Sequence, residues 1–186
     1  MSIEMPRREF LAMTMTAVPV ATLAAPASDG GGGALAKAIY VPVGQDRSGV
    51  RKGLGISTID VKVATADTAG AILVIENTNR ARGGPARHLH TAQDELFCVL
   101  EGEYVIEVGT DRFSLKAGDT ILAPRQVPHV WAYVGASVGR LLITFSPAGQ
   151  MEAFFREVAK NNAMPPQDPA LWRAHGMELL GPPLAV

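Results

Sequence analysis

The chain has little cysteine, no run of like charges and no long apolar segment. Its single cysteine, Cys98, cannot form a disulfide within the chain, so the fold has to depend on its core and on any ion that it binds. With 17 Lys and Arg against 18 Asp and Glu, and no basic cluster, the sequence gives no sign of a nucleic-acid-binding surface. No segment reaches the roughly 20 apolar residues of a membrane-spanning helix. We therefore expect no membrane span in the mature form and no nucleic acid as a partner.

The first 27 residues have the composition of an export signal rather than of a folded element. Arg7 and Arg8 precede a mildly apolar run over residues 11–25, and Ala25 and Ala27 are small residues of the kind that a signal peptidase reads. This segment resembles a twin-arginine signal. The resemblance implies the twin-arginine export machinery as a partner, cleavage after Ala27 and a periplasmic or secreted protein. A frayed amphipathic N-terminus is the alternative.

Short apolar runs separated by Gly, Asp, Asn and Pro recur from residue 40 to residue 147. Frequent glycine (19) and proline (13) predict many turns, which favours an all-β class over a helical bundle. The sequence Glu101-Gly102-Glu103 predicts a hairpin between two of the strands, and such a series implies a sandwich or a barrel. The predicted strands are 56–64, 69–76, 95–100, 104–108, 112–115, 120–123, 127–134 and 140–145.

The C-terminal part has a helical pattern instead. Met151, Phe154 and Val158 follow at helical spacing, and Asp168 and Gly176 frame a second, shorter helix. The predicted organisation is a signal peptide at 1–27, a flexible linker at 28–39, a barrel at 40–147 and a C-terminal helical extension at 148–186 that packs on the barrel.

Three of the four histidines lie close together in the sequence, next to a glutamate. His88 and His90 are two residues apart, so on a strand both point to the same face. Glu95 opens the next predicted strand, and His129 opens a later one. Three imidazoles and a carboxylate form a mixed N/O donor set, which suits a first-row divalent metal such as Fe, Mn, Ni, Cu or Zn.

This spacing resembles the two motifs of the cupin superfamily. His88-x-His90, Glu95 and Gly102 match the first motif, and Gly118, Pro124 and His129 match the second. Gly83 lies one residue nearer to the histidines than the first motif asks, and Gln126 stands where the second usually has glycine. The segment 176–183 resembles the ending of small one-barrel (monocupin) quercetin-dioxygenase-like proteins.

The resemblance implies a cupin double-stranded β-helix, which is a jelly-roll barrel, with short C-terminal helices. It implies one divalent metal ion, held by His88, His90, Glu95 and His129, and it is compatible with a homodimer. By strand parity or by their place in the turn before His129, five further residues are predicted to line a substrate pocket. These residues are Phe97, Trp131, Tyr133, Arg125 and Gln126.

The function predicted from this resemblance is that of a metal-dependent oxidoreductase of dioxygenase type, acting on a small aromatic or enolic compound. Glu95 would serve as ligand and as base in turn. Two alternatives stay open, because a fold does not prove a function. One is a non-redox metal-dependent isomerase, decarboxylase or lyase, and the other is a non-catalytic periplasmic small-molecule-binding cupin.

Overall fold

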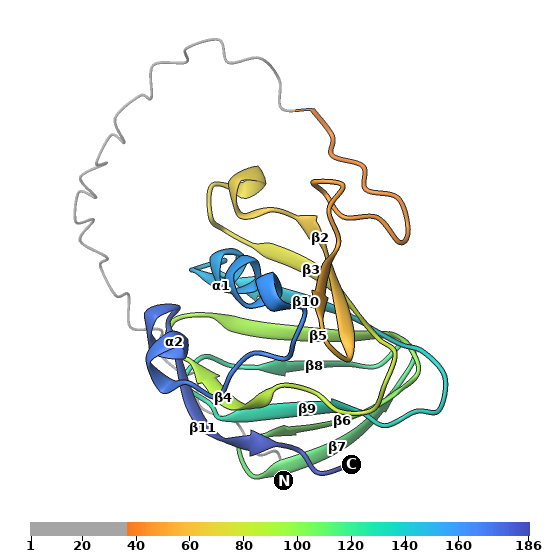
Figure 1. Ribbon diagram of the computed structural model, residues 1–186, viewed down its shortest axis with the longest axis vertical. Coiled ribbons are helices and arrows are strands. Elements are labelled where there is room, and N and C mark those ends of the chain that lie inside the picture. Colours follow the sequence, from red (N-terminus) through yellow and green to blue (C-terminus); the bar gives the residue numbers. More distant parts are fainter. Residues whose placement is uncertain (1–36) are drawn as a thin grey trace, which may run out of the picture. The chain divides into compact units, whose positions relative to one another are not determined.

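The computed structural model describes residues 37–186, whose main secondary structure is antiparallel strands (Figure 1). The predicted signal peptide and most of the predicted linker lie outside the described residues. Within the described part of the chain, no helix has the length and hydropathy needed to cross a membrane. The all-β class predicted from the sequence is confirmed.

The first sheet has six strands in the order β1-β2-β3-β10-β5-β8. Its inward residues alternate with outward ones along each strand, as the sequence pattern predicts. In β3, for example, Leu73 and Ile75 are buried while Val74 between them is partly exposed. The strands are β1 (Lys52–Leu54), β2 (Ser57–Val63), β3 (Leu73–Asn79), β10 (Gly139–Ser146), β5 (Asp94–Glu101) and β8 (Thr120–Ala123).

The second sheet has five strands in the order β11-β4-β9-β6-β7 and faces the first. Apolar side chains from both sheets, including Phe97 and Ile143 from the first and Ile106 from the second, form a shared core. Two facing antiparallel sheets of this order form the cupin jelly roll. The strands are β11 (Met177–Pro183), β4 (Ala86–His90), β9 (His129–Tyr133), β6 (Glu103–Val108) and β7 (Asp111–Lys116).

The predicted hairpin at Glu101-Gly102-Glu103 is wrong. β5 and β6 do not pair, because β5 belongs to the first sheet and β6 to the second. Gly102 therefore marks a corner, where the chain leaves one sheet for the other. Its φ of 84° suits glycine, and a Cβ there would lie only 3.0 Å from the carbonyl oxygen of Val138.

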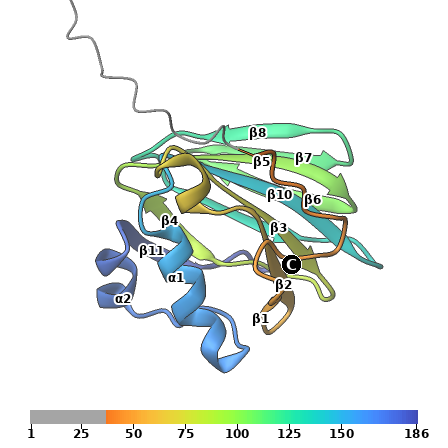
Figure 2. The same cartoon turned by 90° about the horizontal axis from the view of Figure 1, so that it is seen from above.

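The two C-terminal helices lie on one side of the barrel, as Figure 2 shows. They are α1 (Met151–Val158) and α2 (Pro169–Ala174), and the short 3-10 helices are η1 (Thr65–Thr68) and η2 (Ala159–Asn161). α1 buries Met151, Phe154 and Val158, which confirms the helical spacing read from the sequence. α2 begins where Asp168 accepts a hydrogen bond from the Ala170 amide, which confirms the predicted cap.

The segment 148–186 is more than a helical extension, because it also supplies β11, an edge strand of the second sheet. β11 pairs with β4, so that Met177 lies opposite His90 and Leu179 opposite His88. The sequence pattern did not predict this strand, since Gly181, Pro182 and Pro183 are residues that normally interrupt strands. An edge strand tolerates proline because one side of it needs no ladder hydrogen bond.

Candidate metal centre

β4 carries two histidines on the face that points into the barrel. Along this strand Ala86, His88 and His90 are buried while Arg87 and Leu89 are partly exposed, which is the alternation of a strand with one side in the core. Arg87 points away and forms an ion pair with Glu107 of β6. The two imidazoles are thereby directed to one point in the interior.

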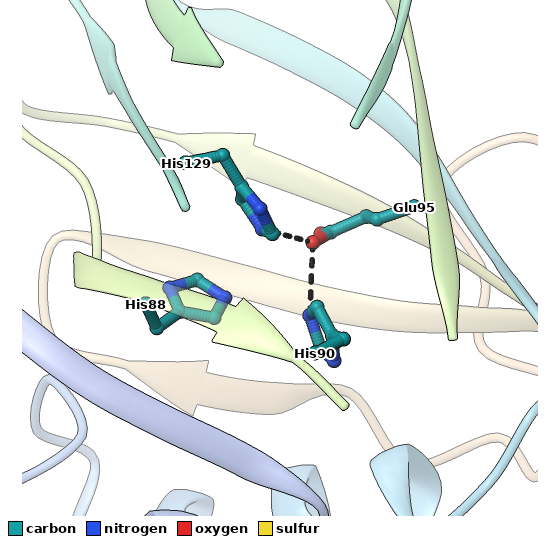
Figure 3. Close-up of side chains that lie close together, drawn as sticks. All are labelled: His88, His90, Glu95 and His129. Carbon is teal, nitrogen blue, oxygen red and sulfur yellow. Dashed lines mark hydrogen bonds and ion pairs between the residues drawn. The ribbon is translucent and has the colours of Figure 1, made fainter. Parts of the chain in front are cut away.

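The remaining two candidate ligands lie at the beginnings of two other strands. Glu95 is the second residue of β5, in the first sheet, and His129 is the first residue of β9, in the second sheet. One ligand atom from each of His88, His90, Glu95 and His129 lies within 4.8 Å of the others, and all four side chains are buried. Figure 3 shows the four side chains pointing toward one another. The convergence expected from the motif spacing is present.

Hydrogen bonds fix the orientation of the cluster. The Nε2 atoms of His90 and His129 donate to one oxygen of Glu95, at 3.0 and 2.9 Å, as the dashed lines of Figure 3 mark. The Nδ1 atom of His88 donates to the carbonyl of Ala86 at 2.8 Å, and that of His129 donates to the carbonyl of Val127 at 3.1 Å. Donation from Nδ1 leaves Nε2 of His88 as the nitrogen that can bind an ion, whereas Nε2 of His129, which donates to Glu95, must first lose its proton.

Burial and hydrogen bonding give the members of the cluster different protonation states. Burial lowers the pKa of His88 to about 3, with the neighbouring His129 and His90 adding to the shift, so this imidazole is neutral at pH 7. Burial alone would raise the pKa of Glu95, but the hydrogen bonds from His129 and His90 outweigh burial and lower it. Burial opposes a charge on His129, yet its hydrogen bond to Glu95 raises its pKa above the ordinary value.

An apolar cavity with an empty volume of about 570 Å³ opens beside the cluster. His88, His90 and Glu95 line it on one side, so a small molecule in the cavity would contact the ligands directly. Its walls come from both sheets and from the C-terminal segment. The other lining residues are Leu54, Ile56, Ser57, Ile59, Ile75, Asn77, Asn79, Gly84, Pro85, Trp131, Ile143, Phe145, Met151, Phe154, Phe155, Met164, Pro165, Trp172 and Met177.

Of the five residues predicted for a substrate pocket, Trp131 lines this cavity and the other four do not. Phe97 is fully buried, with its ring centroid 6.2 Å from that of His129. Tyr133 is also buried and packs against Tyr104. Strand parity correctly assigns both rings to the interior, but it does not tell which interior residues border empty space.

Arg125 and Gln126 lie at the surface. Arg125 forms two side-chain hydrogen bonds with Asp94, at 3.0 and 2.7 Å, and this pairing lowers the pKa of Asp94 to about 2. Gln126 adopts a left-handed backbone with φ of 64°, which explains why related motifs have glycine there. The turn before His129 thus holds its two polar side chains away from the cavity.

Several cavity residues were not identified from the sequence. Trp172 of α2 is 1% exposed, and its ring centroid lies 5.0 Å from that of His88. Its helix was predicted, but no local pattern shows which ligand a distant helix will touch. Asn77 and Asn79 did leave a signal, because both amides fall at inward positions of a strand whose other inward residues are apolar.

Comparison with known proteins finds a family model and solved structures that are similar to parts of this chain. Residues 79–145, which include all four clustered side chains, match the family model described as "Cupin domain". The matched segment spans less than half of the chain and contains β4, β5 and β9, the strands that carry the cluster. The uncharacterized protein MJ1618 of Methanocaldococcus jannaschii is 33% identical over 48 residues, which are 26% of this chain and 38% of that protein. The match thus spans well under half of this curated relative.

Among solved structures, similar chains include an RmlC-like cupin from Shewanella frigidimarina, with 23% identity and a TM-score of 0.46 over 55% of this chain and 87% of that one. Pac13, a nucleoside dehydratase from Streptomyces, has 16% identity and a TM-score of 0.45 over 55% and 79% of the two chains. KdgF from Halomonas has 18% identity and a TM-score of 0.44 over 50% and 79%.

Proposed function

We propose that the chain is a metal-dependent oxidoreductase of dioxygenase type that acts on a small aromatic or enolic compound. One observation carries the proposal: a buried cluster of three histidines and a glutamate borders a cavity whose other walls are mainly apolar and aromatic and carry no charged side chain among the described residues. Such a cavity favours an apolar substrate, held with an oxygen atom toward the cluster.

The four side chains fit a divalent ion. Their ligand atoms lie within 4.8 Å of one another, and their nitrogen and oxygen donors suit Fe, Mn, Ni, Cu or Zn. Glu95 accepts hydrogen bonds from the Nε2 atoms of His90 and His129, so these two nitrogens and the carboxylate point to the position that an ion would share. A redox-active ion bound there supplies oxygen activation beside a chelating substrate.

The protein side chains position the substrate and handle its proton. The carboxylate of Glu95 is ionised at neutral pH, but the hydrogen bonds from His129 and His90 that lower its pKa also weaken it as a base. To accept a proton from an enolic or phenolic hydroxyl, its oxygen must first be released from these hydrogen bonds. Apolar and aromatic walls, including Phe145 and Trp131, exclude water from the reacting group. Among the described residues that line the cavity, none is Lys, Arg or Asp, which disfavours phosphorylated or dicarboxylate substrates.

The test is metal analysis of the purified protein, followed by oxygen-uptake measurements with catechols and flavonols. Iron, copper, nickel or manganese together with oxygen consumption supports the proposal. Turnover without oxygen consumption would instead favour the isomerase, decarboxylase or lyase alternative. Tight binding without turnover would favour a binding protein. The Glu95→Gln variant should lose uptake, whereas His175→Gln, which changes the one histidine outside the cluster, should keep it.

We also propose that the chain is exported by the twin-arginine route, with a location in the periplasm or outside the cell. The support is the sequence of residues 1–27, which lies outside the described residues. Replacement of both Arg7 and Arg8 by lysine should leave the protein inside the cell. Fractionation of cells that express the two forms measures this, and equal export of both forms would contradict the proposal.

A further inference from the structure

The inward faces of β2 and β3 change from apolar to polar toward one end. Along β3 the inward residues are Leu73 and Ile75, followed by Asn77 and Asn79. On β2, Ser57 lies directly opposite Asn79. Ser57, Asn77 and Asn79 are at most 5% exposed, and all three line the cavity. The cavity therefore has a second polar region besides the metal cluster.

The hydrogen bonds of this region leave one donor without a partner. The side-chain oxygen of Asn79 accepts from the Asn77 amide at 2.6 Å and from the Tyr104 hydroxyl at 3.1 Å. These two contacts occupy the oxygen end of the Asn79 amide. The Nδ2 of Asn79 is buried and has no hydrogen-bond partner among the described residues. A buried N–H group without an acceptor destabilises a protein, so this group would gain from a ligand oxygen.

The polar region lies some distance from the metal cluster, and the positions of their partner residues along β10 give an estimate of that distance. On this central strand Phe145 lies opposite Glu95, and Leu141 lies opposite Asn77. Four residues separate the two positions, which corresponds to about 13 Å along the strand. Ile143, midway between them, lines the cavity together with Ile75, its partner on β3. The two polar ends are thus joined by an apolar wall.

Charge restricts what the distal region can bind. Among the described residues that line the cavity, Glu95 is the only acidic one, and Lys and Arg are absent. An anionic group at the distal end would be desolvated without a compensating cation. A neutral oxygen avoids this cost and still accepts from an amide N–H.

We propose that Ser57, Asn77 and Asn79 form a distal subsite, which binds a hydroxyl or carbonyl oxygen at the far end of an elongated, uncharged substrate. The other end of the substrate reaches the metal cluster, and this part of the inference rests on the proposed function. The Nδ2 of Asn79 donates to the ligand oxygen, and the Oδ1 of Asn77 is an acceptor for a ligand hydroxyl.

Two flavonols test the distal subsite. Galangin and kaempferol share the metal-chelating hydroxyl and carbonyl pair and differ by one hydroxyl at the far end of the phenyl ring. Each is titrated by calorimetry into the whole protein, once loaded with zinc and once treated with a chelator. We expect wild-type protein to bind kaempferol about tenfold more tightly than galangin, the effect of one well-placed hydrogen bond.

The variants Asn77→Leu and Asn79→Leu keep the side-chain size and remove the amide. Each should reduce the preference for kaempferol to about onefold while galangin binding changes little. Ile143→Val, the matched control in the apolar wall, should weaken both flavonols equally. A merely structural role of the asparagines would likewise affect both probes alike. Should Asn79→Leu fail to fold, Asn77→Leu and Ser57→Ala decide the question.

Three results would overturn the subsite. They are equal affinities of the two flavonols for wild-type protein, a preference that persists in the asparagine variants, and no binding of either flavonol. Oxygen uptake, measured in separate iron-loaded and chelator-treated samples of the same protein, reports on the proposed reaction independently. A kaempferol preference without oxygen uptake would support the distal subsite and contradict the proposed dioxygenase activity. Oxygen uptake without the preference would support the dioxygenase activity and contradict the subsite.

Discussion

Glu95 is the residue on which the arrangement of the cluster depends most. Its carboxylate is buried between two imidazoles and accepts a hydrogen bond from each. A buried carboxylate is tolerated only when such partners or a cation compensate for lost hydration. The same side chain therefore supplies negative charge for an ion and orients His90 and His129 through hydrogen bonds.

The Glu95→Gln variant should bind divalent metal at least about 100-fold more weakly, because changes to the groups around a ligand alone cost about 10- to 100-fold. Competition against a chromogenic chelator with Zn²⁺ or Mn²⁺ measures this affinity. His175→Gln is the control, since His175 bonds to the Leu171 carbonyl outside the cluster. Unchanged affinity in Glu95→Gln would show that the glutamate is no ligand.

Glu76 should make part of the stability dependent on pH. Burial raises its pKa, but hydrogen bonds from Arg140 and Lys62 outweigh burial and lower it below the ordinary value of 4.5. The unfolded chain thus takes up this proton first, so the stabilisation is complete above pH 4.5 and is lost as the pH falls below it. Glu76→Gln should cost about 1–3 kcal/mol at pH 7 and should flatten the stability profile below pH 4.5.

Urea unfolding at pH 7 and at pH 3.5 measures both effects of the Glu76 change. Glu103→Gln is a suitable control, because Glu103 is exposed at the start of β6. If Glu76→Gln and wild type lose equal stability between the two pH values, then the ion pairs of Glu76 do not contribute to acid sensitivity.

At the scale of elements, the corner at Gly102 decides how the chain passes between the sheets. Both Gly102 and Gly118 have positive φ, 84° and 95°, so alanine at either position adopts a strained backbone that costs about 1–2 kcal/mol. Only at Gly102 would the new Cβ also collide, with Tyr133 at 2.9 Å and with Gly139 at 3.0 Å. Gly102→Ala should therefore lower the free energy of unfolding by a further ~1–3 kcal/mol.

Urea unfolding of Gly102→Ala and Gly118→Ala separates the backbone cost from the steric one. Nothing lies within 4 Å of a Cβ built at Gly118, which makes it the matched control. Equal losses of stability would mean that the corner adjusts without cost and that Tyr133 and Gly139 do not confine it.

Most of the correct predictions of strands and of metal ligands came from residue alternation along strands and from the spacing of the ligands in the sequence. Alternating residues located the strands around Ile75 and Ile143 because burial of one face is a local property. The passage at Gly102 was misread, since a glycine turn looks the same whether the next strand pairs with the previous one or enters the other sheet. Contacts such as that of Trp172 with His88 depend on residues far apart in the chain, which no local pattern encodes.

At the scale of the whole molecule, metal should stabilise the fold, because the ligands come from three strands in two sheets and the unfolded chain holds them apart. At a free metal concentration of 100 times Kd the gain is about 2.7 kcal/mol. For a chain of this size that corresponds to a rise in Tm of about 5–10 °C. Thermal unfolding with Zn²⁺ or Mn²⁺, and again after a chelator, measures the gain.

Two controls accompany the thermal measurement. His129→Ala should show no metal-dependent rise in Tm, since it removes one ligand from the cluster. Mg²⁺, which prefers oxygen ligands, should raise the Tm of wild type little. A rise of equal size in the variant would place metal binding elsewhere on the chain.

The pairing of β11 with β4 has a consequence for when the centre can assemble. His88 and His90 lie on a strand whose neighbour on one side contains Met177 and Leu179, and Trp172 packs against His88. On the ribosome, a nascent chain that has produced all four ligands still lacks this supporting strand and the tryptophan. Synthesis must proceed beyond residue 179 before the ligands are held as described, so loading with an ion is expected to follow translation rather than accompany it.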